Sequence, residues 1–271
     1  MTHGIEALLS RRATPLTDKD AVWAIRTIRE FLPRAVKDGG DVEARNQMAY
    51  AEYTAGMKER TNQFLKHFVS LHQDLCPVQT DILNVCETLL NVYQKGGKVL
   101  ICGNGGSCAD GDHIVGELMK GFLLKRPLNQ EMKDKFTQCY GEEGTMIAEK
   151  LQCGLPTISL NAHAALISAF SNDVDSRLIY AQQVMGFAVE GDAVIGISTS
   201  GNAANVEYAL MAAKAVGAVS IALTGRDGGK IGKIADYSVI VPAWETYRIQ
   251  EYHLAIYHLI SAYIESEIFT D

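Results

Sequence analysis

The stretch KVLICGNGGSCADGDHIVGELMKGF (98–122) decides how this chain folds. It opens with an apolar run of strand length, continues through a glycine-rich NGGS, and ends in a segment with helical spacing. A strand that passes through glycines into a helix exposes backbone N–H groups at the helix start, where they can bind an anion or a sugar hydroxyl. Because the same pattern also arises simply to make the turn, the motif alone leaves a structural and a binding role open.

Four further apolar runs of strand length follow, at LPTISL (155–160), AVIGIS (193–198), VSIALT (219–224) and YSVIVP (237–242). Helical stretches separate the five strands, near 107–122, 163–170, 174–188 and 202–216, and a final helix is expected over about 245–268. Strands that alternate with helices predict an α/β fold, here a five-stranded parallel sheet flanked by helices on both faces.

The residues before this sheet read as helical. Apolar side chains recur at helical spacing over 19–37, about 42–75 and 78–94. We therefore expect an all-helical N-terminal extension over 1–58 and an α/β domain over 59–271. The polar segment 125–154 interrupts the alternation, and it either packs beside the mouth of a site or forms a flexible surface loop.

Composition and charge narrow the class of protein. The 271 residues are 47% hydrophobic and carry a formal net charge of −7, which argues against a nucleic-acid surface built on a broad basic field. The six cysteines include no C-x-x-C pair, as expected for reduced thiols. The first twenty residues lack a long apolar run, so the sequence predicts neither a signal peptide nor a membrane anchor. We therefore expect a cytoplasmic location.

A second loop of the same kind is GISTSGN (196–202), again between an apolar strand and a helix. Its hydroxyls, on Ser198, Thr199 and Ser200, are donors that can surround a phosphate without adding charge. Ordinary capping of the following helix needs one such residue. Three in a row favour a ligand.

Two helices carry side chains suited to acid/base chemistry. His113 and Glu117 are four residues apart, so they share a helix face, although a surface contact is the usual role of such a pair. The closing helix contains RIQEYHLAIYH (248–258), in which Gln250 and His258 are separated by about 12 Å of helical rise. They can share a ligand only if long side chains converge or if different subunits each supply one.

Taken together, these stretches resemble the SIS (sugar isomerase) domain, a flavodoxin-like fold, and within it the phosphoheptose isomerases, which act on sedoheptulose 7-phosphate. The resemblance covers roughly residues 60–268. It is carried by GNGGS-x5-H-x3-E (103–117), SND (171–173), GDAVIGISTSGNAANV (191–206), LTGRDGGKI (223–231) and RIQEYHLAIYH (248–258).

The resemblance implies an aldose–ketose isomerase that converts sedoheptulose 7-phosphate to D-glycero-D-manno-heptose 7-phosphate through an enediol. It implies a homotetramer with active sites at subunit interfaces, and no nucleic-acid or membrane partner. Glu117 and His258 match the acid/base pair, and zinc is the implied cofactor, with His113, Glu117, Gln250 and His258 as its ligands. The positions that match substrate contacts are Asn104, Gly105, Gly106, Ser107, Asn172, Asp173, Ser198, Thr199, Ser200 and Gln250.

Several positions depart from the family pattern. Ala203 stands where the family has a serine, a loss for which the charge of Lys120 could compensate; Gly121 replaces an arginine and Tyr247 an acidic residue. Because these departures affect the substrate end, an isomerase of another phosphosugar is one alternative. A non-catalytic SIS module that binds sugar phosphates or proteins is the other, and retention of Glu117 and His258 argues against it.

Residues 13–57 are similar to a helical stretch of iron-containing alcohol dehydrogenases. The metal-binding histidines of that family do not follow here, and no nucleotide-binding half is present. We therefore expect a helical appendage without redox function, which packs against the SIS core or widens an oligomer interface.

Overall fold

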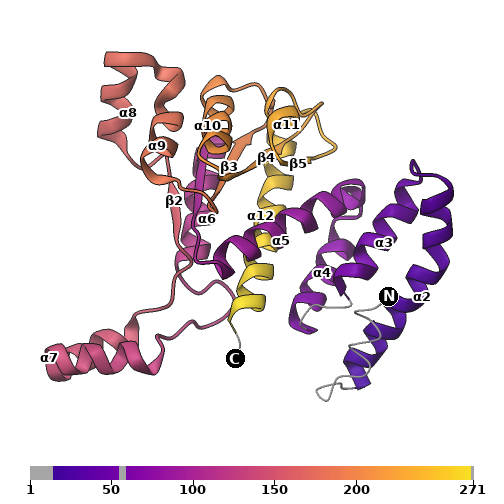
Figure 1. Cartoon of the computed structure of the whole chain (residues 1–271), viewed down its shortest axis with the longest axis horizontal. Coiled ribbons are helices and arrows are strands. Elements are labelled where there is room, and N and C mark those ends of the chain that lie inside the picture. The colour runs from indigo at the N-terminus through magenta and orange to yellow at the C-terminus, as the bar shows by residue number, and fades with distance from the viewer. Residues whose placement is uncertain (1–14, 55–58, 270–271) are drawn as a thin grey trace. The chain divides into compact units, whose positions relative to one another are not determined.

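The computed structural model describes residues 15–54 and 59–269 (Figure 1). Backbone contacts divide the chain into two compact units, Met1–Cys86 and Glu87–Asp271, and helix α5 (Gln79–Gln94) runs across the division. The boundary that we expect between residues 58 and 59 stays a prediction, since it falls beside residues 55–58, which lie outside the described residues.

The first unit is helical where it is described. Helices α2 (Pro15–Lys37) and α3 (Val42–Thr54) form a hairpin around Ala24, Ile28 and Ala51. Helix α4 (Glu59–Leu71) and the 3-10 helix η1 (Gln73–Val78) follow, so the stretch predicted as helical over about 42–75 is helical where it is described, with α4 ending at Leu71.

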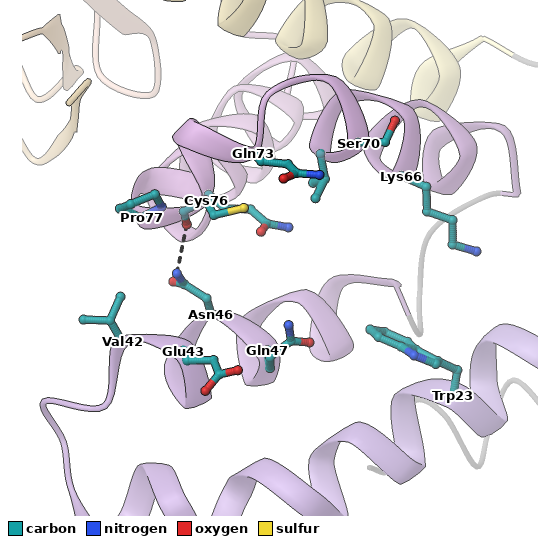
Figure 2. Close-up of a pocket in the computed structure, with 12 residues that line it drawn as sticks. Trp23, Val42, Glu43, Asn46, Gln47, Lys66, Ser70, Gln73, Cys76 and Pro77 are labelled. Carbon is teal, nitrogen blue, oxygen red and sulfur yellow. Dashed lines mark hydrogen bonds between the residues drawn. The ribbon is translucent and has the colours of Figure 1, made fainter. Parts of the chain in front are cut away.

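A groove of about 700 Å³ opens between these helices (Figure 2). Trp23 of α2 lines one end, and Asn46 of α3 lies near Cys76 at the other. The Asn46 amide donates to the Cys76 carbonyl at 2.9 Å and accepts from the Thr80 hydroxyl at 2.9 Å. These bonds tie α3 to η1 and to the start of α5.

The second unit contains the predicted sheet. Its strands, within the described residues, are β1 (Val99–Gly103), β2 (Thr157–Ser159), β3 (Ala193–Ser198), β4 (Val219–Thr224) and β5 (Tyr237–Ile240). All neighbours pair in parallel, in the order β2-β1-β3-β4-β5. Every residue of β1 and β3 is buried, as expected for strands covered on both faces. The predicted fold class is confirmed.

Helices cover both faces of this sheet. Helices α6 (Gly106–Met119) and α12 (Thr246–Ile268) lie on one face and contact each other (Figure 1). The other face carries α9 (Ile179–Phe187), α10 (Ala204–Ala215) and α11 (Ile231–Ile234), which enclose a core with Leu100, Val194 and Ala222. Helix α8 (Ala164–Phe170), a π-helical turn η2 (Ser171–Asp175) and a 3-10 turn η3 (Ser176–Leu178) lead into α9.

The segment 125–154 is a helical hairpin rather than a flexible loop. Helix α7 (Gln130–Lys150) is broken at Gly141, whose φ of 58° is unfavourable for other residues. At the base of the hairpin Pro127 bridges Gln152, and the Gln152 side chain accepts from the Gly121 N–H at 2.8 Å. The base is thus fixed to the end of α6, close to Glu117, while α7 extends away from the sheet (Figure 1).

Two sequence expectations about the chain's environment can be compared with the structure. All six cysteines are free, as predicted. Among the helices of residues 15–54 and 59–269, none is long and apolar enough to cross a membrane.

Candidate active site

The two glycine–serine loops meet at the carboxyl ends of β1 and β3. These strands are neighbours, and the order of the sheet reverses between them, which is where ligands bind in folds of this kind. The Asn104 amide donates to Asn205 at 2.8 Å, and the Asn205 amide donates back to Asn104 at 2.9 Å. This reciprocal pair holds the first loop against the start of α10.

The first loop leaves room for close approach by a ligand. Gly105 has a φ of 56°, and a Cβ on Gly106 would lie 2.0 Å from the amide nitrogen of Gln250. Gln250 of α12 therefore covers the start of α6. Ser107 is buried, and the Tyr180 hydroxyl donates to the Gly103 carbonyl at 2.7 Å, which fixes the end of β1.

The second loop is held from behind by the LTGRDGGKI segment. The Gly201 carbonyl accepts from the N–H groups of Lys230 and Ile231 at 2.8 and 3.0 Å. Ser198 is buried, and Thr199 and Ser200 are half-buried. The N-cap of α10 is Ala203, whose side chain has no hydrogen-bonding atom, so none of the three hydroxyls serves as that cap. We call residues 104–107 and 198–201 together the cradle.

The predicted acid/base residues meet between α6 and α12. His113 Nε2 lies 3.1 Å from Glu117 Oε1, and the His113 and His258 rings are 5.1 Å apart, edge to face. The Tyr257 hydroxyl lies 2.8 Å from His113 Nδ1. Phe122 stacks on His258 with the ring centroids 5.6 Å apart. We call His113, Glu117, Tyr257 and His258 the acid/base cluster.

Burial shifts the pKa of two groups at this site, His258 and Asp110. Burial and the neighbouring His113 lower the pKa of His258, and Glu117 partly offsets them, so the imidazole is neutral at pH 7. Burial also raises the pKa of Asp110, one turn before His113, to about 6. Glu117 Oε2 is buried and has no hydrogen-bond partner among the described residues. A neutral imidazole beside a carboxylate oxygen with free acceptor capacity is suited to proton transfer.

Helix α6 separates the cluster from the cradle within one chain. Glu117 lies eleven positions after Gly106 along the helix, a rise of about 16 Å. Gln250 lies at the cradle end and His258 at the other. Lys120 lies 3.8 Å from Glu117. The expectation that Lys120 compensates for Ala203, the N-cap of α10, stays a prediction.

The remaining predicted substrate residues are Asn172 and Asp173. Asn172 and Asp173 are exposed on η2, and the Asn172 amide donates to the Asp173 carboxylate at 2.8 Å. Within the described part of the chain neither side chain hydrogen-bonds to the cradle. Their assignment as substrate contacts stays a prediction.

The metal site implied by the resemblance is only partly assembled. No group of three or more His, Cys, Asp or Glu side chains in position to hold a metal ion is present in residues 15–54 and 59–269. His113, Glu117 and His258 are nevertheless neighbours, with donor atoms of the kinds that zinc accepts. The hydroxyl of Tyr257 orients His113 as an outer partner of a metal ligand would. By donor type these three residues suit zinc, although their side chains as placed in the described residues do not form a three-ligand group.

Sequence reasoning missed several residues of the site. Asp110 is one turn before His113 on the same helix face, and Tyr257 directly precedes His258, so their positions alone offered a signal. Asn205 lies three residues after the GISTSGN loop, within the stretch 191–206 that carries the resemblance. Arg126 and Glu265, which contact the end of α6, are 139 residues apart and gave no local signal.

Comparison with known proteins agrees with this geometry. The family model "SIS domain" matches residues 159–266, and the C-terminal model of the Fe-containing alcohol dehydrogenase family matches residues 1–71. The phosphoheptose isomerase of Trichlorobacter lovleyi is 35% identical over 207 residues, 76% of this chain and 92% of that protein. The phosphoheptose isomerase of Aneurinibacillus thermoaerophilus is 37% identical over 69% of this chain and 82% of its own length.

Solved structures also include phosphoheptose isomerases that resemble this chain. The phosphoheptose isomerase of Neisseria gonorrhoeae matches with a TM-score of 0.58 and 30% identity, over 77% of this chain and 98% of that one. Sheet order, cradle and matching model together define a SIS-domain protein. Within that class, the chain belongs to the phosphoheptose isomerase family. The resemblance of the N-terminal helices to iron-containing alcohol dehydrogenases is likewise confirmed.

Proposed function

We propose that this protein is an aldose–ketose isomerase that converts sedoheptulose 7-phosphate to D-glycero-D-manno-heptose 7-phosphate. The observation that carries the proposal is that Glu117 and His258, 141 residues apart in sequence, are neighbours in the structure. One carboxylate oxygen of Glu117 is buried and has no hydrogen-bond partner in the described residues. Family membership with phosphoheptose isomerases supports the choice of substrate.

Glu117 acts as the base in this proposal. Its carboxylate removes a proton from C1 of the ketose, and the electrons of the broken C–H bond form the C1–C2 double bond of a cis-enediol. The same carboxyl group returns the proton to C2, which leaves an aldehyde at C1. No atom is gained or lost, and the only group that moves between carbons is the proton that Glu117 carries.

His258 moves protons between the two oxygens. Because its imidazole is neutral at pH 7, it can donate a proton to O2 while the enediol forms and accept the proton of O1 as the aldehyde forms. The Tyr257 hydroxyl, bonded to His113, and the Phe122 ring, stacked on His258, restrict the orientation of the two imidazole rings.

The cradle binds the phosphate. Hydroxyls of Ser198, Thr199 and Ser200 and the N–H groups at the start of α10 can surround its oxygens. In this proposal the first loop and α12 supply the other substrate contacts, from Asn104, Gly105, Gly106, Ser107 and Gln250. The phosphate takes no part in the chemistry; its binding positions the reacting end of the sugar.

Zinc is part of the proposal, with His113, Glu117 and His258 as ligands. Gln250 is the fourth ligand in the family pattern, and it would have to leave its position over Gly106 or come from another copy. When bound, zinc would act as a Lewis acid toward the sugar oxygens. Zinc content of the wild type and of His113→Ala tests the assignment, and equal zinc in both removes His113 from the ligand set.

An oligomer, a homotetramer in the proposal, completes the site. The rise of about 16 Å along α6 keeps one chain's cradle away from its own acid/base cluster. A cradle from one copy beside a cluster from another removes that separation. Light scattering coupled to gel filtration measures the mass, and a monomer that isomerises the sugar contradicts this part. A cytoplasmic location likewise stays a prediction.

Isotope exchange tests the reaction itself. The protein is incubated with sedoheptulose 7-phosphate in deuterated water, beside Glu117→Gln. We expect deuterium on the carbon next to the carbonyl only with the wild type. Absence of exchange with every ketose phosphate tried favours the alternative, a SIS module that binds sugar phosphates without catalysis, and exchange with a different sugar corrects the substrate alone.

A further inference from the structure

A buried ion pair lies just beyond the acid/base cluster. Arg126 Nε donates to Glu265 Oε1 at 2.7 Å, and the two side chains are 0% and 1% exposed. Arg126 precedes the α7 hairpin, and Glu265 is in the last turns of α12. Burying two charges costs several kcal/mol, so a buried ion pair is weak evidence of a gain in stability. Its other contacts point to a different role.

Arg126 caps the helix that carries Glu117. Its Nη1 donates to the Leu118 carbonyl at 2.7 Å, and its Nη2 lies 3.3 Å from the Glu117 carbonyl. The last carbonyls of a helix have no partner within the helix, and a cation there is favourable. One guanidinium therefore fixes the backbone of Glu117 itself, as well as the residue that follows.

Glu265 fixes the loop that follows the same helix. Its carboxylate accepts from the N–H groups of Phe122, Leu123 and Leu124 at 2.8, 2.7 and 3.0 Å. These bonds hold Phe122 in a defined place relative to α12, where its ring stacks on His258. Glu265 lies seven residues, two helical turns, beyond His258 on the same helix.

We propose that Arg126 and Glu265 are positioning residues for the isomerase reaction. Together they hold the backbone of Glu117 and, through Phe122, the ring of His258 in one arrangement. The inference rests on the proposed function, because the distance between base and imidazole matters only if both move protons. A displacement of about 1 Å can cost catalysis about a hundredfold.

The chain offers a matched control at the other end of the sheet. Asp192, 2% exposed, accepts from the Lys98 ammonium and from the N–H groups of Lys98 and Val189. This pair is also a buried carboxylate held by a cation and by backbone N–H groups. It lies at the amino ends of β1 and β3, opposite the cradle, and touches no residue of the acid/base cluster.

The experiment uses the full-length protein. Arg126→Met with Glu265→Gln removes both charges and keeps an oxygen acceptor for the loop. Arg126→Lys keeps the charge but loses the planar fork, so it serves if the double variant does not fold. Asp192→Asn is the control. We measure kcat and KM for sedoheptulose 7-phosphate, the melting temperature, and amide hydrogen exchange over residues 117–124.

We expect kcat to fall about tenfold to a hundredfold in the double variant, with KM within about twofold and faster exchange at residues 122–124. The kcat of Arg126→Lys should lie between that of the double variant and that of the wild type. Asp192→Asn should lower the melting temperature and leave kcat unchanged. Wild-type kcat in the double variant, or an equal loss of kcat in Asp192→Asn, overturns the proposal.

Amide hydrogen exchange distinguishes a failure of the positioning role from a failure of the proposed reaction. A wild-type protein that isomerises no ketose phosphate contradicts the proposed reaction, whereas unchanged exchange at residues 122–124 in the double variant contradicts the positioning role by itself.

Discussion

The cradle and the acid/base cluster are built in different ways. The cradle consists of backbone and short hydroxyl side chains that lie within five residues of one another in each loop, at the ends of adjacent strands. The cluster consists of large side chains from α6 and α12, whose members are up to 145 residues apart in sequence. A site can therefore combine a binding part specified locally with a reacting part specified only by packing.

The difference predicts how each part responds to mutation. Cradle substitutions should weaken binding of the phosphate and leave the chemical step intact, because phosphate contacts are equal in ground and transition states. Cluster substitutions should lower kcat. Four substitutions, taken from the largest expected effect to the smallest, examine that separation.

Glu117→Gln should have the largest effect. The amide cannot accept the C1 proton, so kcat should fall about a hundredfold to ten-thousandfold while KM changes little. Steady-state kinetics with sedoheptulose 7-phosphate measures both. Glu149→Gln, an exposed carboxylate on α7, is the control and should behave as the wild type. A KM effect without a kcat effect would place Glu117 in the binding part.

Ser200→Ala should give the opposite pattern. It removes one hydroxyl from the cradle, and a hydrogen bond to a charged group contributes about 1.5–3 kcal/mol, so the substrate Kd should rise about tenfold to a hundredfold. Calorimetric titration with the sugar phosphate measures it, beside Ser168→Ala on the exposed end of α8. An unchanged Kd would remove Ser200 from the cradle.

Gly106→Ala tests whether the Gln250 side chain contributes to binding at the cradle. The new Cβ would lie 2.0 Å from the flexible end of that side chain, so the amide should move away from the cradle without unfolding the helix. We expect binding weaker by about threefold to tenfold. Gly116→Ala is the control on the same helix; its Cβ meets open space, and it should stabilise the protein by about 0.5–1 kcal/mol. Equal behaviour of the two variants would contradict the contact.

Ala203→Ser is expected to have the smallest effect. It restores a hydroxyl at the N-cap of α10, which typically adds about 1 kcal/mol of stability. If the same hydroxyl reaches a phosphate bound in the cradle, two residues away, binding of inorganic phosphate should become a few-fold tighter. Thermal unfolding with and without phosphate measures both effects. A stabilised protein with unchanged phosphate affinity would show that Ala203 limits only the helix cap.

The sequence predicted most of the fold because each strand was a separate apolar run. β3 and β4 occur at their predicted bounds, and α10 and α12 begin within two residues of expectation. The sequence could not predict the hairpin in 125–154, since α7 is polar along its length and its break depends on Gly141. The helical stretch predicted over about 42–75 is helical where it is described, but the end of α4 at Leu71 was not predicted, because regular spacing alone does not reveal where a helix ends.

By itself the sequence determined the parallel sheet, the two glycine–serine loops and the sharing of one helix face by His113 and Glu117. These features depend on residues that are near one another in the chain, where periodicity and turn chemistry act. Tertiary structure alone decided that His258 lies beside His113 and Glu117, and that Arg126 and Glu265 join the ends of α6 and α12. Those contacts follow from how two helices pack on the sheet, and packing depends on the shape of every side chain between them.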